Sequence, residues 1–107
     1  MTSHADLISE DEVLATVRET AELTGWKVYK TWISIHSPAG YPDLTLANPR
    51  RHLVLFVECK GSRGRVTQAQ QDWMETLNQC GPSVKAVICW PKDLDSTLEL
   101  LTNGWKI

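Results

Sequence analysis

Long apolar runs are missing from this chain of 107 residues, and no stretch reaches the roughly 18 apolar residues that a membrane-spanning helix needs. Residues 1–11 are polar and acidic, and they lack the apolar core of a signal peptide. These two absences argue against a membrane or secreted protein. We therefore expect a protein that works in the cytoplasm.

Cysteine is scarce as well. The three thiols, Cys59, Cys80 and Cys89, are an odd number and contain no CxxC pair. Zinc sites and disulfide frameworks need more numerous or more closely spaced thiols. The pattern favours buried, reduced cysteines.

A large net charge is also absent, since the formal charge is −2. The charges are unevenly distributed, because acidic residues gather in residues 1–22 and basic residues gather in the middle of the chain. A local basic face of this kind can hold nucleic-acid phosphates even on a mildly acidic protein. The basic residues that we expect to contact DNA are Lys30, Arg50, Arg51, Arg63 and Arg65.

The hydrophobic fraction of 42% is sufficient for one core, and no repeat or linker divides residues 1–107, so we expect a single domain. Ser9 and Glu12 form a capping-box pattern that predicts a helix up to Leu23, closed by Gly25. Thr67 and Gln70 form a second such pattern, which predicts a helix that ends before Gly81–Pro82. A third helix, capped by Asp93 or Asp95, extends through Leu101.

Apolar and β-branched residues predict strands at 26–36, 43–47, 53–57 and 84–90. The order of elements is α-β-β-β-α-β-α. The helix between the last two strands implies a right-handed crossover, which makes those strands parallel neighbours. The sequence therefore predicts an α/β domain with a mixed central sheet flanked by helices.

Three charged residues stand where the strand pattern predicts burial. Pro42-Asp43 follows a glycine turn and opens a strand, and Glu58 and Lys60 lie where the apolar run 53–57 ends. Alternate residues of a strand share a face, so Glu58 and Lys60 project together while Cys59 points into the core. Desolvating a carboxylate and an ammonium at such a place is costly without partners or a purpose.

Phosphodiester hydrolysis supplies such a purpose. Mg²⁺ or Mn²⁺ neutralises charge on the phosphate and activates water, and Mg²⁺ prefers one or two carboxylates with waters as remaining ligands. We expect Asp43 and Glu58 to bind this ion, with the backbone carbonyl of Cys59 as a third ligand. Lys60 would orient the attacking water or stabilise charge on the phosphate. The alternative interpretation is an exposed cross-strand ion pair, which is the commoner fate of a Glu-x-Lys tripeptide.

The two segments Gly40-Tyr41-Pro42-Asp43-Leu44 and Leu55-Phe56-Val57-Glu58-Cys59-Lys60-Gly61 resemble the PD-(D/E)xK nuclease superfamily. The basic loop and glutamine-bearing helix at 63–73, together with the segments at 81–87 and 90–94, are similar to its VRR-NUC branch. The resemblance runs from about Ser9 to Leu101. It implies a restriction-endonuclease-like core.

The resemblance also implies roles for individual residues. Asp43 and Glu58 would bind the metal, Lys60 would be the catalytic lysine, and Gln70 would position water or phosphate. Gln70 also has the capping role, and we expect one amide not to serve both roles fully. An acidic residue of the first helix completes such sites, and we favour Glu10 over Glu12, which has a capping role.

Two positions depart from the pattern of the branch: Cys59 stands between the glutamate and the lysine, and Lys30 stands where histidine is frequent. We expect His36 and His52 to be surface or DNA-contact residues and not metal ligands. Three tryptophans, Trp26, Trp32 and Trp105, could equally fill the core or form an interface.

Stand-alone members of this branch occur in phages and resemble four-way-junction (Holliday junction) resolvases, which act as homodimers. We therefore expect a DNA endonuclease that selects branched structures, works as a homodimer and, if a phage encodes it, acts in the host cytoplasm. Two alternatives stay open. One is a nickase or trimming nuclease without junction preference, and the other is a catalytically inactive DNA-binding module.

Overall fold

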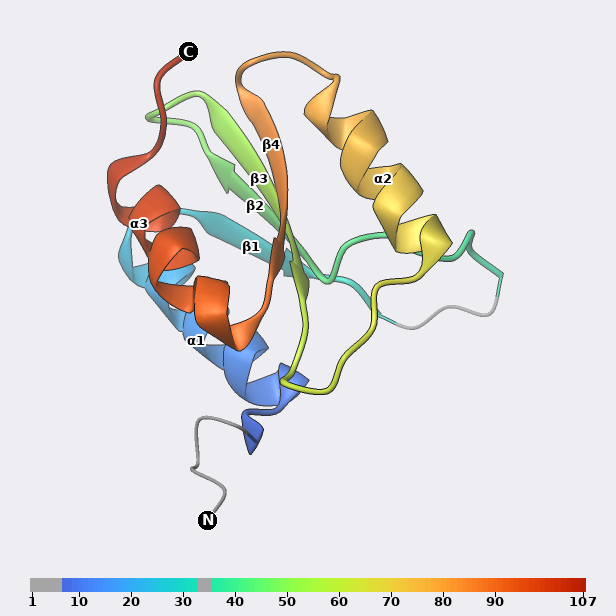
Figure 1. The fold of residues 1–107 in the computed structure, drawn as a ribbon. Coiled ribbons are helices and arrows are strands. Elements are labelled where there is room, and N and C mark those ends of the chain that lie inside the picture. Colours follow the sequence, from blue (N-terminus) through green and yellow to red (C-terminus); the bar gives the residue numbers. More distant parts are fainter. Residues whose placement is uncertain (1–6, 33–35) are drawn as a thin grey trace.

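The computed structural model describes residues 7–32 and 36–107. One four-stranded sheet lies between helices (Figure 1). The elements are α1 (Glu10–Leu23), β1 (Lys27–Lys30), β2 (Leu44–Asn48), β3 (Leu53–Cys59), α2 (Gln68–Asn78), β4 (Val84–Cys89), the 3₁₀ turn η2 (Pro91–Asp93) and α3 (Leu94–Asn103). No helix within these described ranges is long and apolar enough to cross a bilayer.

The strands lie in the order β1-β2-β3-β4, with β1, β2 and β3 antiparallel and β4 parallel to β3. The mixed sheet and the order of helices and strands are those predicted. The parallel pair is joined through α2, as the crossover rule requires. Because β3 is central, its last residues lie beside both β2 and β4.

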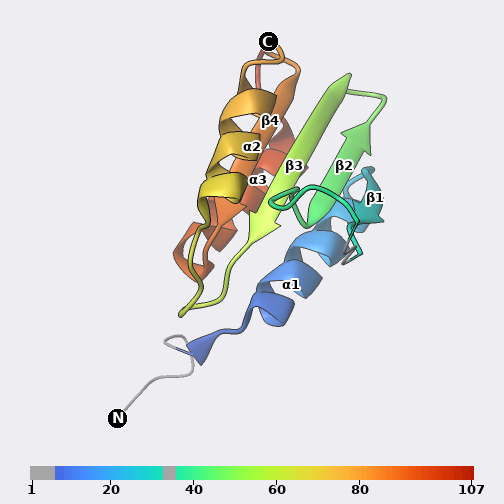
Figure 2. The ribbon, with the colours of Figure 1, turned by 90° about the vertical axis from the view of Figure 1, so that its right-hand side faces the viewer.

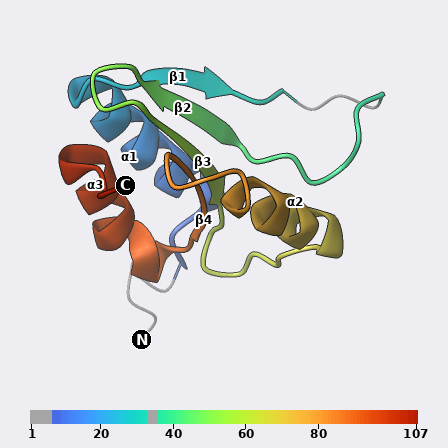
Figure 3. The same cartoon turned by 90° about the horizontal axis from the view of Figure 1, so that it is seen from above.

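Helices cover the two faces of the sheet unequally. Figure 3 shows α1 and α3 together on one face and α2 on the other. Side chains of β2 and β3 alternate between the faces, so Leu46, Leu55 and Cys59 join the core beneath α1 and α3. Cys59 therefore points into the core, as the alternation predicts.

The first strand is shorter than predicted. β1 ends at Lys30 rather than at residue 36, and residues 33–35 lie outside the described part of the chain. The ladder ends there because the partner strand β2 begins at Leu44, which lies opposite Lys30. Thr31 still follows β2 for one step, and its backbone nitrogen donates to the Asp43 carbonyl at 2.8 Å.

Two of the three tryptophans belong to the core. The Trp26 and Trp105 rings stack with centroids 6.2 Å apart, and the Trp26 indole nitrogen donates to the Leu101 carbonyl at 2.8 Å. Trp32, by contrast, is 79% exposed. The cysteines also divide, since Cys59 and Cys89 are buried and free whereas Cys80 is free but exposed, contrary to the expectation for it.

Arg51 lies in the turn between β2 and β3, and it has a structural role that the sequence did not predict. Its two terminal guanidinium nitrogens donate to the carbonyls of Asn103 and Thr102 at 2.9 and 3.1 Å. These carbonyls end α3, where a cation also complements the helix dipole. The guanidinium is therefore held at the end of α3 by the fold, while a contact between Arg51 and DNA stays a prediction.

Replacing Arg51 tests this role. We expect Arg51→Ala to lower the free energy of unfolding by about 1 kcal/mol, because the α3 carbonyls lose their charged donors. Arg50→Ala is the matched control, since the neighbouring Arg50 is exposed. Urea unfolding of both variants measures the effect, and equal stabilities of the two would contradict it.

Candidate metal centre

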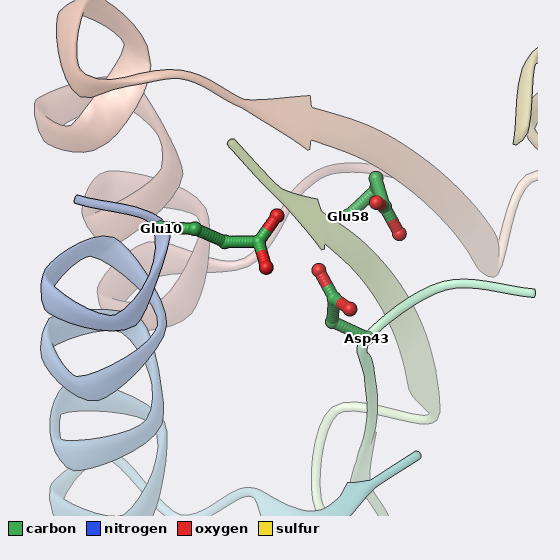
Figure 4. A group of neighbouring side chains, drawn as sticks. All are labelled: Glu10, Asp43 and Glu58. Atoms are coloured by element: carbon green, nitrogen blue, oxygen red, sulfur yellow. The ribbon is translucent and has the colours of Figure 1, made fainter. Parts of the chain in front are cut away.

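Three carboxylates from three separate segments meet at one end of the sheet. Asp43 precedes β2, Glu58 lies near the end of β3, and Glu10 begins α1 (Figure 4). One oxygen of each lies within 4.8 Å of the others. The register explains the first pair, because Leu44 faces Val57 and the next residues along the ladder are Asp43 and Glu58. The expected adjacency of Asp43 and Glu58 is thus present.

The loop after β3 fixes the position of Glu10. The Ser62 backbone nitrogen donates to the Ile8 carbonyl at 2.8 Å, and the Ile8 nitrogen donates to the Ser62 hydroxyl at 3.1 Å. Gly61 permits this approach, because a Cβ there would lie 2.7 Å from the Glu10 backbone nitrogen. These contacts place Glu10, and not Glu12, in the carboxylate group of the described residues.

Glu58 is almost completely buried, with an exposure of 2%. Its Oε2 accepts from the Gln70 side-chain nitrogen at 2.8 Å and lies 3.4 Å from the Lys60 ammonium. Its Oε1 is buried and has no hydrogen-bond partner among the described residues. Burying a carboxylate oxygen without a hydrogen-bond partner costs free energy. A bound ligand at this atom would supply the partner that the described residues do not.

Gln70 serves two purposes through the two ends of its amide. Its oxygen accepts from the Thr67 backbone nitrogen at 3.0 Å, which completes the capping box at the start of α2. Its nitrogen donates to Glu58. The oxygen is thus used by the cap and the nitrogen by Glu58, and the role of Gln70 toward water or phosphate stays a prediction.

Asp43 is held by the backbone of the neighbouring strand. Its Oδ2 accepts from the Cys59 backbone nitrogen at 2.8 Å. This bond leaves Oδ1 for another partner and directs the carboxylate toward Glu58 and Glu10 (Figure 4).

Burial and mutual repulsion make the three carboxylates hard to ionise together. Desolvation raises the pKa of Glu58 to about 7, and the nearby Asp43 adds to this shift. Desolvation also raises the pKa of Asp43, against the backbone bond from Cys59, and it raises the pKa of Glu10 with a contribution from Asp43. Lys60 offsets the repulsion only in part.

A divalent cation fits this arrangement. Carboxylate oxygens are the ligands that Mg²⁺ and Mn²⁺ accept, and a charge of +2 would relieve the repulsion among three acids. Oε1 of Glu58 is a carboxylate oxygen that no donor of the described residues uses. The donor set contains neither histidine nor thiolate, so it does not resemble a zinc site. His36 and His52 are both exposed and lie outside this group.

The predicted DNA-contact residues are divided between the two ends of the sheet. Lys30 ends β1 next to the site, and its charge lowers the pKa of Asp43. Arg63 lines a groove of about 310 Å³ with Glu10, and Arg65 is exposed on the same loop. Arg50 and Arg51 precede β3, roughly 20 Å from Glu58 along a strand that rises about 3.3 Å per residue.

Residues that position the carboxylates were missed at the sequence level. Gly61 and Ser62 attach the loop to α1, and Gly40 lies against the start of α2, where a Cβ would be 2.7 Å from the Gln70 nitrogen. The glycines flanking the charged motifs could have indicated these contacts, because glycine permits close approach of two backbones.

Comparisons with known proteins bear on the family and the fold of the chain. Residues 5–89 match the family model described as the VRR-NUC domain. The Caenorhabditis briggsae protein named "Fanconi-associated nuclease 1 homolog" is 35% identical over 63 residues, which make up 59% of this chain but only 7% of that protein. A solved structure titled "VRR_NUC domain" superimposes with a TM-score of 0.65 at 26% identity, covering 90% of this chain and 97% of that one.

The raised pKa of Glu58 predicts how the stability of the metal-free protein varies with pH. Below pH 4.5 Glu58 is protonated in both the folded and the unfolded state; above pH 7 it is charged in both. Between these values the folded state holds the proton more tightly, so stability falls as pH rises. We expect the wild type to lose about 2–3 kcal/mol relative to Glu58→Gln across this window. Denaturant unfolding in EDTA measures the difference, and a difference that does not change with pH would contradict the assignment.

Proposed function

The chain belongs to the VRR-NUC family, and from that premise we propose that it is a nuclease that hydrolyses DNA phosphodiester bonds with Mg²⁺ or Mn²⁺. The observation that carries the proposal is the group of Glu10, Asp43 and Glu58, together with a buried oxygen of Glu58 that has no partner among the described residues. A structural ion pair alone would not need three acids within 4.8 Å of one another. The name of the curated relative, a nuclease, supports the same activity.

Each residue of the centre has a definable task. Glu10, Asp43 and Glu58 would hold the divalent ion, and the Cys59 carbonyl stays a predicted further ligand. When bound, the ion would neutralise phosphate charge and lower the pKa of a water molecule. Gln70 holds Glu58 by donating to Oε2, and Oε1 would be available to the ion.

Lys60 carries the remaining positive charge of the centre. It is only 6% exposed and is the one buried cation among residues 7–32 and 36–107. Its ammonium group lies 3.4 Å from Glu58 Oε2, so it would lie beside a metal held by that carboxylate. We assign it to orienting the attacking water or stabilising the charge that develops on the phosphate.

The narrower substrate assignment is a branched duplex such as a four-way junction, cut by a homodimer. It rests on the family resemblance and on the size of the chain. A single copy places Lys30, Arg63 and Arg65 near the centre, which is a small basic surface for a long duplex. A second copy related by two-fold symmetry would double this surface and present two centres to two strands.

Metal affinity tests whether Glu10 or Glu12, in the same helical turn, completes the ligand set. We expect Glu10→Gln to weaken Mn²⁺ binding by at least about 10-fold, the lower end of what even outer-shell partners contribute. Glu12→Gln is the matched control, because Glu12 is exposed two residues further along and is not part of the carboxylate group. Titration calorimetry above pH 7 measures both. Equal affinities in the two variants would remove Glu10 from the ligand set.

Cleavage assays test the activity itself. With labelled linear, flap and four-way DNA in Mg²⁺ or Mn²⁺, we expect cutting that EDTA abolishes. Asp43→Asn should reduce the rate by about 100-fold or more, since the isosteric amide keeps the bond from Cys59 but loses the charge. Asp95→Asn, an exposed acid at the start of α3, should cut normally.

The pattern of products discriminates among the remaining possibilities. Paired symmetric cuts confined to four-way DNA, together with a dimeric mass by light scattering, would support the resolvase assignment. Cutting of all substrates would leave a general nuclease. No cutting with either metal would overturn the proposed activity and favour an inactive DNA-binding module.

A further inference from the structure

A second recognition feature lies beside the carboxylates, on the face of the sheet that α2 covers incompletely. Helix α2 packs on β4, so no helix of the described residues covers the half of that face formed by β1 and β2, and the loop before β2 crosses it (Figure 2). The ladder places Tyr29 opposite Thr45, and Thr45 opposite Phe56, on this face. Tyr29 is 60% exposed as a result.

The open half of the sheet forms one wall of a groove of about 660 Å³. Four aromatic side chains line it: Tyr29, Trp32, Tyr41 and Trp73. Tyr41 and Trp73 pack edge to face with ring centroids 5.0 Å apart, so this wall is fixed. The volume lies within the range of pockets that hold a ligand of nucleotide size.

The groove and the proposed catalytic centre share a residue. Asp43 lines the groove and also belongs to the carboxylate group. It is the one acidic residue among the described lining residues. Whatever occupies the groove therefore adjoins the place where the scissile phosphate would bind.

Exposed aromatic rings next to a cation indicate a surface that binds a ligand and does not contact water alone. Trp32 is 79% exposed, and the Lys30 ammonium lies 5.8 Å from the centroid of its ring. Aromatic platforms combined with basic groups are the way in which proteins hold single-stranded nucleic acid, because each base offers a face for stacking. Paired bases inside a duplex have both faces covered by their neighbours.

We propose that this aromatic groove binds an unpaired nucleobase of the DNA next to the scissile phosphate, stacked on Trp32 or Tyr29, with Lys30 near its phosphate. The inference rests on the proposed nuclease function and adds to it the feature of DNA that the site reads. A fully paired duplex has no free base to place there. The groove would thus favour DNA with a flap, a gap or an open branch point.

The test compares binding of two DNAs in EDTA, so that neither metal nor cleavage enters the result. One is a duplex with a short unpaired flap that carries 2-aminopurine, and the other is the same duplex fully paired, at one salt concentration. We expect Trp32→Ala to weaken flap binding by roughly 5- to 100-fold, the factor that loss of one base–aromatic stack gives. Binding of the paired duplex should not change.

Two further variants control for side-chain loss as such. Trp32→Phe should keep flap binding within about two-fold of the wild type, because a ring remains for stacking. Leu23→Ala removes another exposed apolar side chain, 87% exposed at the end of α1, and should have no effect. Quenching of 2-aminopurine by the wild type, and its loss in Trp32→Ala, would report the stack directly.

Three outcomes would overturn the inference. Unchanged flap binding in Trp32→Ala would remove the groove from recognition, and equal weakening for both DNAs would remove its selectivity. Conversion of a dimer to a monomer by Trp32→Ala would make this face a protein interface. These measurements need no catalysis, so the two proposals can fail separately. If the wild type cuts DNA and Trp32→Ala binds flaps as well as the wild type does, only the groove is refuted. A wild type that binds flaps but never cuts would refute only the nuclease.

Discussion

The burial of the Glu58 carboxylate is the constraint around which this domain is arranged. Free energy is needed to remove that charge from water, and the fold supplies only part of it through Gln70 and Lys60. The second oxygen has no partner among the described residues, and two more acids lie beside it. The protein alone is therefore electrostatically unfavourable at this point, and a bound divalent cation is the simplest group that would complete it.

Close backbone contacts, more than side-chain chemistry, hold the centre together. Gly61 lets the loop after β3 touch the start of α1, and Gly40 lets the loop before β2 touch the start of α2. Each contact fixes one ligand or its support, because Glu10 begins α1 and Gln70 lies in the first turn of α2. The same arrangement leaves β1 and β2 without a helix on the face that α2 shares, where the aromatic groove lies.

Local patterns predicted the parts of the site that depend on neighbours along one strand or across one ladder. Asp43 and Glu58 follow from strand alternation and pairing, and the start of α2 follows from its capping box. The dual use of Gln70 and the role of Arg51 depend on atoms brought together by tertiary packing. The end of β1 depends on where its partner strand β2 begins, which the residues of β1 alone do not contain. Residues 33–35, predicted as strand, lie outside the described ranges.

The central claim is that one divalent ion binds among Glu10, Asp43 and Glu58. Crystals of the protein grown with Mn²⁺ would test it most directly, because anomalous scattering locates the ion without reference to activity. We expect one strong peak within coordination distance of all three carboxylates, with Glu58 Oε1 among the ligands. A peak elsewhere with this position vacant, or a direct hydrogen bond to Oε1 from a protein donor at full Mn²⁺ saturation, would contradict it.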